Sequence, residues 1–181
     1  MTGVLYDGTS GDPTVIAYDP GGTTGWAVFS VHPDSLTEPD IRVFDNINHQ
    51  AWGEFTGSEF AMVDAMVDLA DEWPGAALVS EHFIMYERSA GRKDENLLSL
   101  VRLNAAFRYG LYRTAGTIRP VERQAASLAM TTVTDDRLKA WGYWAKTEGK
   151  PHARDAIRHA LTMLKRLKVS AKLRKTIFPA L

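Results

Sequence analysis

Short apolar runs alternate with turn-rich and amphipathic stretches along the chain, and this pattern predicts mixed α and β structure. Five runs have the composition of strands, at 14–19, 26–31, 41–47, 76–85 and 116–121. The run at 76–85, AALVSEHFIM, is apolar enough to predict a strand buried on both faces. The turn-forming stretch PGGTTG between the first two runs predicts an antiparallel hairpin.

Between these runs, apolar residues recur at helical spacing. The expected helices cover 56–73, 95–115, 122–130, 136–146 and 152–168. The first has Phe60, Val63, Met66, Val67 and Ala70 on one face, with Thr56 and Glu59 placed to form a capping box. The second has Leu97, Leu98, Val101 and Leu103 on its apolar side, and Asp135 or Asp136 is the expected N-cap of the fourth.

The order of elements predicts a single α/β domain with a mixed sheet covered on both faces. Three strands come first, and helices then alternate with the remaining two strands. We expect a flexible N-terminal arm over 1–13, the domain over 14–168 and a basic C-terminal tail over 169–181.

Charge is segregated along the chain, although the net charge is only −1. Residues 1–81 carry 14 acids and one base, whereas residues 137–181 carry two acids and 12 bases. Such a basic part is typical of a polyanion partner, but also of a solubilising helix end. The chain has no cysteine, no apolar run of membrane-spanning length and no secretion signal. We therefore expect a cytoplasmic protein without disulfides, thiolate zinc sites or a membrane partner.

Three acids occupy positions where a carboxylate is costly. Asp19 ends the first strand, Glu81 lies inside the apolar fourth strand, and Asp155 lies in the last helix. Taken singly, each acid fits an arginine salt bridge or an exposed strand end. Three acids in this arrangement favour a shared divalent cation.

The segments around these acids resemble the motifs of the RuvC-type Holliday junction resolvases, which belong to the RNase H-like nucleases. The resemblance runs over roughly residues 14–167 and rests on AYDPGGTTGWAVF, LVSEHF and PHARDAIRHAL. It implies an RNase H-like five-stranded mixed sheet, the first three strands antiparallel, with helices on both faces. In length and layout the chain is similar to phage-encoded members, which is consistent with a phage-infected or bacterial cell as its setting.

The resemblance also implies a function. The chain would be an endodeoxyribonuclease that resolves Holliday junctions or related branched DNA by paired nicking. Its catalytic residues and metal ligands would be Asp19, Glu81, His152 and Asp155, holding two Mg²⁺ ions that Mn²⁺ can replace. The partners implied are a four-way DNA junction and a second copy of the chain, with the homodimer formed through the helix at 95–115.

Several of these residues have more than one interpretation. His152 stands where many family members have aspartate, and it can bind metal, act on water or cap the last helix. His159 is either a neighbour of the ligands or a polar helix position. Gly21, Gly22 and Gly25 fit either close approach of a phosphate backbone or an ordinary tight turn.

The DNA-binding candidates lie in two basic segments. In the loop after the fourth strand they are Tyr86, Arg88, Arg92 and Lys93, and before the last helix they are Lys139, Lys146 and Lys150. Tyr86 is favoured to stack on a base, and Phe83 is favoured as a core residue. Each lysine also fits a solvated surface position.

Three other functions compete with the junction resolvase. A flap or fork nuclease would use the same residues, because the choice of substrate depends on surface shape. An ATP-binding protein of the actin or sugar-kinase class has a similar D-x-G-T-T turn, but it needs a second phosphate loop that this chain lacks. A DNA-binding module without cleavage would not need all four ligand-capable residues.

Overall fold

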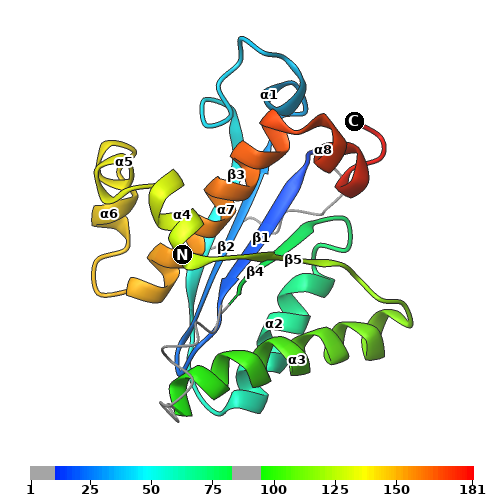
Figure 1. Ribbon diagram of the computed structural model, residues 1–181, viewed down its shortest axis with the longest axis vertical. Helices are drawn as coiled ribbons and strands as arrows, with labels where there is room; N and C mark the ends of the chain where they lie inside the picture. Colours follow the sequence, from blue (N-terminus) through cyan, green and yellow to red (C-terminus); the bar gives the residue numbers. More distant parts are fainter. Residues whose placement is uncertain (1–10, 83–94) are drawn as a thin grey trace.

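The structure, a computed structural model, describes residues 11–82 and 95–181 and is built on a five-stranded sheet (Figure 1). The strands are β1 (Thr14–Asp19), β2 (Thr24–Val31), β3 (Ile47–Phe55), β4 (Ala77–Glu81) and β5 (Val121–Gln124). They lie in the order β3-β2-β1-β4-β5. The pairs β1–β2 and β2–β3 are antiparallel, and β1–β4 and β4–β5 are parallel. The predicted mixed sheet is therefore confirmed.

Helices cover both faces of this sheet. Within the described residues they are α1 (Asp34–Thr37), α2 (Glu59–Asp71), α3 (Glu95–Ala115), α4 (Ala126–Thr132), α5 (Asp135–Ala140), α6 (Tyr143–Lys146), α7 (Pro151–Val169) and α8 (Ala171–Ile177). Helices α2 and α3 pack together on one face, and α7 crosses the other (Figure 1). None of the helices in the described part of the chain has the length and apolarity to cross a membrane.

Strand alternation divides the core into two layers. On β1, Val15 and Ala17 belong to the cluster under α7, whereas Ile16 and Tyr18 belong to the cluster under α2 and α3. Successive side chains of a strand point to opposite faces, so a short apolar run supplies both clusters. Since Asp19 follows Tyr18, the same alternation directs its carboxylate to the α7 face.

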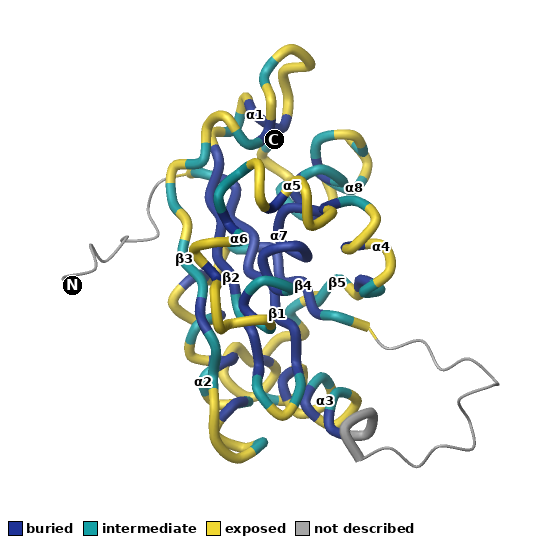
Figure 2. Tube along the Cα trace, turned by 90° about the vertical axis from the view of Figure 1, so that its left-hand side faces the viewer, coloured by how far each residue is buried: buried dark blue, intermediate teal, exposed yellow. Residues whose placement is uncertain are grey.

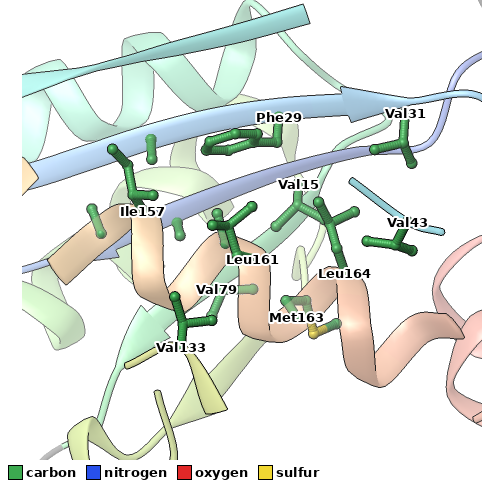
Figure 3. Packing of buried hydrophobic residues seen from close by; sticks show 14 of the residues in the cluster. Val15, Phe29, Val31, Val43, Val79, Val133, Ile157, Leu161, Met163 and Leu164 are labelled. Atoms are coloured by element: carbon green, nitrogen blue, oxygen red, sulfur yellow. The ribbon is translucent and has the colours of Figure 1, made fainter. Parts of the chain in front are cut away.

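Helix α7 is the main element of that face and is buried along most of its length (Figure 2). Ile157, Leu161 and Leu164 pack against Phe29 and Val15 of the sheet (Figure 3). Burial of one such side chain contributes about 1.5–3 kcal/mol, so α7 is anchored firmly over the sheet. This anchoring fixes the polar residues of its first turns relative to the ends of β1 and β4.

The two edge strands lie elsewhere than predicted. The third strand was expected at 41–47 but occupies 47–55, and the fifth was expected at 116–121 but occupies 121–124. Val43 and Phe44 pack into the core from a loop, which explains why this segment resembles a strand. Edge strands carry polar side chains on their exposed positions, so their apolar signal is weak.

Smaller boundaries also differ from the prediction. Strand β2 begins two residues early, and the helix expected at 122–130 begins at Ala126. The helix expected at 136–146 is two helices separated at Gly142, whose φ of 78° interrupts helical geometry. Its N-cap is Thr134, and neither Asp135 nor Asp136 takes that position.

Helix α3 begins where expected and α2 begins three residues later than expected, and both bury partly different residues. The N-cap of α2 is Ser58 and not Thr56, and Phe60 is 83% exposed while Met62 is buried. On α3, Val101 is 54% exposed while Leu103 is buried. The predicted apolar faces are therefore wrong at these two exposed positions.

The structure also describes parts of the predicted strand at 76–85 and the predicted tail at 169–181. Strand β4 covers 77–81, and residues 83–85 of its predicted range lie outside the described residues. The segment 169–181 contains α8, and its Leu173, Ile177 and Phe178 pack against the cluster under α7.

Candidate active site

The ends of two neighbouring parallel strands bring Asp19 and Glu81 together. Asp19 is the last residue of β1 and Glu81 the last of β4, and the register pairs Tyr18 with Ser80 just before them. Because Tyr18 and Ser80 point away from α7, the next residue of each strand points toward it. Two carboxylates therefore meet under the first turns of α7.

Asp19 is paired with His152 of α7. It is 8% exposed, and the Nδ1–H of His152 donates to its Oδ2 at 2.9 Å. Burial raises the pKa of Asp19 to about 6, the hydrogen bond from His152 opposes the shift, and the Glu81 and Asp155 carboxylates add to it. The site therefore holds Asp19 as a carboxyl group that is costly to ionise without a cation.

His152 is the more accessible member of this pair, since its side chain is 42% exposed. The hydrogen bond to Asp19 raises the pKa of His152 against the opposing effect of burial, with contributions from the Glu54 and Asp155 carboxylates. His152 thus lies between the buried carboxylates and the solvent. It is not the N-cap of α7, because Lys150 takes that position and has no side-chain cap hydrogen bond.

Glu81 is paired with a second histidine, His159, which is 1% exposed. The Nε2 of His159 donates to Oε2 of Glu81 at 3.3 Å, and its Nδ1 lies 3.4 Å from Oε1 of Gln124 on β5. Burial alone would raise the pKa of Glu81, but hydrogen bonds with His159 and Asp19 outweigh it and hold that pKa below its ordinary value. The pKa values of the two carboxyl groups are therefore pushed in opposite directions, that of Asp19 upward and that of Glu81 downward.

Asp155 lies one turn beyond His152 but is engaged elsewhere. Its Oδ1 accepts from Nε of Arg158 at 3.0 Å, and its side chain is 47% exposed. Arg158 is almost fully buried, bridges to Asp135 and donates to the carbonyl of Val133 at 2.7 Å. The salt-bridge interpretation thus describes Asp155 in this arrangement, although its charge still raises the pKa of Asp19.

Glu54 on β3 holds the N-terminus of α7, a role that the sequence pattern did not suggest. Its Oε1 accepts from the backbone N–H groups of His152 at 3.0 Å and Ala153 at 3.2 Å. These N–H groups have no partner within the helix, so Glu54 provides the cap that Lys150 does not.

Gly25 lies directly against the start of the same helix. A Cβ at this position would lie 1.9 Å from the carbonyl oxygen of His152, so only glycine lets β2 pass under the start of α7. Its φ is not positive, and the tight-turn explanation is therefore wrong for it. A Cβ at Gly22 would meet nothing within 4 Å, and one at Gly21 would lie 3.3 Å from the carbonyl oxygen of Thr23.

The DNA-binding candidates divide into two groups. Tyr86, Arg88, Arg92 and Lys93, together with Phe83, lie outside the described residues. Lys139, Lys146 and Lys150 are exposed, and the ammonium groups of Lys139 and Lys146 lie 5.1 Å and 5.7 Å from the ring centres of Trp144 and Tyr143. Lys139 also lies 3.7 Å from Asp136. These three lysines are available at the surface near the first turn of α7.

The residues that converge suit a hard divalent cation in their chemistry. Two carboxylates and an imidazole form an oxygen-rich donor set of the kind that Mg²⁺ or Mn²⁺ takes. Asp19 and Glu81 are close enough to share a proton, and a cation would replace it and relieve their repulsion. Among the described side chains, no three His, Cys, Asp or Glu residues already stand in a metal-binding group. Binding of a cation by these residues would therefore require side-chain rotation, above all of Asp155 away from Arg158.

Comparisons with known proteins identify the fold. No protein-family model matches the chain, and no curated protein matches its sequence. Among solved structures, T. thermophilus RuvC in complex with a Holliday junction substrate matches with a TM-score of 0.54 and 14% identity. The match covers 82% of this chain and 91% of that one. The chain therefore has the RNase H-like fold that RuvC has, with the same five-stranded mixed sheet and surrounding helices.

Proposed function

We propose that this chain is a divalent-metal-dependent endonuclease that nicks branched DNA, with the four-way junction as its substrate. The observation that carries the proposal is the meeting of Asp19 and Glu81 under His152, at one end of a sheet with the RuvC fold. Two carboxylates and a solvent-facing histidine gathered at one sheet edge are more than packing requires, because each buried acid costs stability.

Each residue of the site has a distinct proposed role. Asp19 and Glu81 would hold the metal ions, and His152 would complete the donor set or orient the attacking water. His159 positions Glu81, since it is buried and donates to that carboxylate. Asp155 joins the set on turning from Arg158, which then keeps Asp135 as its partner.

When bound, Mg²⁺ supplies Lewis acidity for activating water and for stabilising charge on the phosphate and the leaving 3′ oxygen. The chain's own contribution is to fix the ligands in place. Burial of Asp19 keeps bulk water away from its carboxylate, Glu81 beside it is only partly exposed, and Glu54 with Gly25 fixes the start of α7. The proposed products carry 5′-phosphate and 3′-hydroxyl ends.

A second part of the proposal is a homodimer through α3. Paired nicks across a two-fold symmetric junction need two active sites. On the solvent side of α3, Val101, Tyr109 and Tyr112 are 54%, 62% and 50% exposed at positions that share one helix face. Contiguous exposed apolar side chains of this kind mark contact surfaces. Sedimentation of wild type and of Tyr109→Lys at micromolar concentration tests this, and a monomeric wild type with and without DNA would contradict it.

One experiment tests the nuclease itself. Purified protein is incubated with labelled four-way junction, flap, fork and linear duplex DNA, with Mg²⁺, with Mn²⁺ or with chelator. We expect metal-dependent, symmetric nicks in the junction and little cleavage of the duplex. Preference for the flap or fork would move the substrate assignment to a branch nuclease of the same fold. Cleavage that persists in chelator would overturn the metal-dependent proposal, and so would absence of cleavage from every substrate.

A further inference from the structure

The C-terminal half of α7 borders a cavity that lies away from the carboxylates. The cavity has a volume of about 560 Å³ and lies between the end of α4, the last turns of α7 and α8. Its lining includes Lys165, Arg166 and Lys172 and the hydroxyl-bearing Thr132 and Thr162, together with the apolar Val169 and Leu173. No acidic residue of the described chain lines it.

Most arginine and lysine side chains of α7 and α8 already have hydrogen-bond or ion-pair partners within the domain. Arg158 binds Asp155 and Asp135, and Arg166 binds Glu122 at 3.1 Å. Lys168 donates to the carbonyls of Glu38 and Ile41, Arg174 donates to that of Leu36, and Arg154 donates to Thr147. These contacts tie α7 and α8 to the rest of the domain.

Three lysines of α7 and α8 have no side-chain hydrogen bond or ion pair within the described residues. They are Lys165, Lys172 and Lys175. Two of the three, Lys165 and Lys172, line the cavity, whereas Lys175 does not. Within α7 and α8, two of the three lysines without such a contact therefore border the cavity. Because five neighbouring cations are committed, the location of these two lysines is not a consequence of basic composition alone.

The floor of the cavity also offers an unused hydrogen-bond donor. Thr162 is fully buried and lines the cavity, and its Oγ1 has no hydrogen-bond partner among residues 11–82 and 95–181. A buried hydroxyl without a partner costs roughly 1–3 kcal/mol, so such groups usually serve a ligand or a water. A threonine hydroxyl beside lysines is a suitable donor set for a phosphate oxygen.

The position of the cavity relates it to the candidate active site. One side of α7 carries four residues at successive spacings of seven, four and three positions, namely Asp155, Thr162, Arg166 and Val169. At 1.5 Å per residue, Lys165 and Val169 lie about 15 to 21 Å along the helix from Asp155. Phosphates of one DNA strand are about 3.4 Å apart along the axis, so for an arm that runs parallel to α7 this span would correspond to about four to six nucleotides.

We propose that this cavity binds backbone phosphates of one DNA arm, about four to six nucleotides from the scissile phosphate. This inference rests on the proposed nuclease function and adds a second point of contact to it. Lys165 and Lys172 neutralise phosphate charge, and the Thr162 hydroxyl donates to a phosphate oxygen. The contact fixes the register of the arm without reading its sequence.

The test compares Lys165→Ala/Lys172→Ala with Lys175→Ala, a matched loss of a neighbouring exposed lysine. Junction affinity is measured in chelator over a range of salt. We expect the double variant to bind about tenfold more weakly, with a salt slope smaller by about two, because two phosphate contacts are lost. Lys175→Ala should change affinity less than twofold. A loss of binding free energy in Lys175→Ala that is half of the loss in the double variant would mean that each lysine contributes equally, and it would reduce the contact to general electrostatics and overturn the proposal.

A second comparison locates the contact on the DNA. Junctions are made with neutral methylphosphonates at four to six nucleotides from the cut site. Wild type should lose affinity for them, while the double variant should bind modified and unmodified junctions alike. Thr162→Val should weaken binding without lowering the melting temperature, since it removes a hydroxyl that the free protein leaves unpaired. Lower stability in Thr162→Val would assign the hydroxyl a structural role.

These outcomes separate the two proposals. Metal-dependent nicking by wild type, with unchanged affinity and salt slope in the double variant, would overturn this contact and leave the nuclease proposal standing. A wild type that binds no branched DNA would overturn both. Stabilisation by inorganic phosphate that the double variant loses, without any change in DNA affinity, would reassign the cavity to a free anion.

Discussion

The two carboxylate–histidine pairs of the site resemble each other in chemistry and differ in exposure. In the Asp19–His152 pair the imidazole is 42% exposed, whereas in the Glu81–His159 pair it is 1% exposed. An accessible imidazole can exchange its carboxylate for a metal, a water or a phosphate, while a buried imidazole can only hold its carboxylate in place. We infer that His152 acts on substrate or metal and that His159 acts through Glu81.

The first and largest prediction removes the acid of the accessible pair. Asp19→Asn should reduce Mg²⁺-dependent nicking about 10³-fold or more, because an amide lacks the charge that stabilises the metal, and metal stabilisation of the transition state amounts to several kcal/mol. Junction affinity in chelator should be unchanged or higher, since one charge that repels phosphate is gone. Single-turnover nicking and fluorescence anisotropy measure both quantities.

The exposed Asp40 offers a matched control, since Asp40→Asn removes the same charge beside Glu38 and Ile41, whose carbonyls contact Lys168 at the other end of α7 from His152. It should leave nicking unchanged. Near-wild-type nicking by folded Asp19→Asn would remove Asp19 from the site. Joint loss of stability and DNA binding would instead make Asp19 a structural partner of its neighbours.

The second prediction places the same substitution on each histidine. His152→Asp should retain or raise Mg²⁺-dependent nicking, because a carboxylate at an accessible position beside Asp19 can complete an oxygen donor set. His159→Asp should destabilise the protein by about 3–5 kcal/mol, because it buries an unpaired carboxylate against Glu81. Urea unfolding and nicking assays on both variants make the comparison. Equal effects at both positions would show that exposure does not separate the two roles.

The third prediction concerns the pH dependence of stability without metal. Folding raises the pKa of Asp19 from 3.8 to about 6, so the folded state binds more protons between these values. Stability should therefore fall by about 1–3 kcal/mol as the pH rises from about 4 to about 6. The raised pKa of His152 acts in the same direction, because its stabilising contact is complete below pH 6.5 and is lost above its folded pKa. The lowered pKa of Glu81 has the opposite sign, but its effect lies below pH 4.5.

Urea unfolding in chelator from pH 4 to 8 checks this, with Asp19→Asn as the reference. The difference in unfolding free energy between wild type and variant isolates the Asp19 contribution. Wild type should lose stability relative to the variant as pH rises, and Mg²⁺ at pH 7.5 should restore wild type alone. A difference that does not change with pH would mean that Asp19 ionises freely in the fold.

The sequence predicted the centre of the site better than its surroundings. The central strands β1 and β4 are recognisable because they are apolar on both faces, and an acid at the end of such a strand is conspicuous. Asp19 and Glu81 were found in this way. The edge strands β3 and β5 show weaker patterns, and one was expected at 41–47 because Val43 and Phe44 are buried from a loop.

Residues that edge strands contribute were therefore missed. Glu54 of β3 contacts His152, which lies about 100 positions further along the chain, and Gln124 of β5 contacts His159, 35 positions further along. Nothing in the local sequence around Glu54 or Gln124 indicates contact with α7. The contacts of Arg158 with Asp135 at the start of α5 and with the carbonyl of Val133 just before it have the same origin, whereas its bridge to Asp155 is local to α7. Long-range pairing of this kind depends on the tertiary fold.

The smallest predicted effect tests one of these missed residues. Glu54→Ala should lower the unfolding free energy by about 1 kcal/mol, the usual value of a helix cap, because the N–H groups of His152 and Ala153 lose their acceptor. It should also slow nicking by about tenfold, since the start of α7 carries His152. Glu54→Gln keeps an oxygen acceptor and should recover most of both losses.

Ser58→Ala is the matched control, because Ser58 caps α2 through the N–H of Ala61 at 3.2 Å and lies on the other face of the sheet. It should cost similar stability without slowing nicking. If Ser58→Ala slows nicking as much as Glu54→Ala does, the effect is one of general stability, and Glu54 has no part in positioning His152.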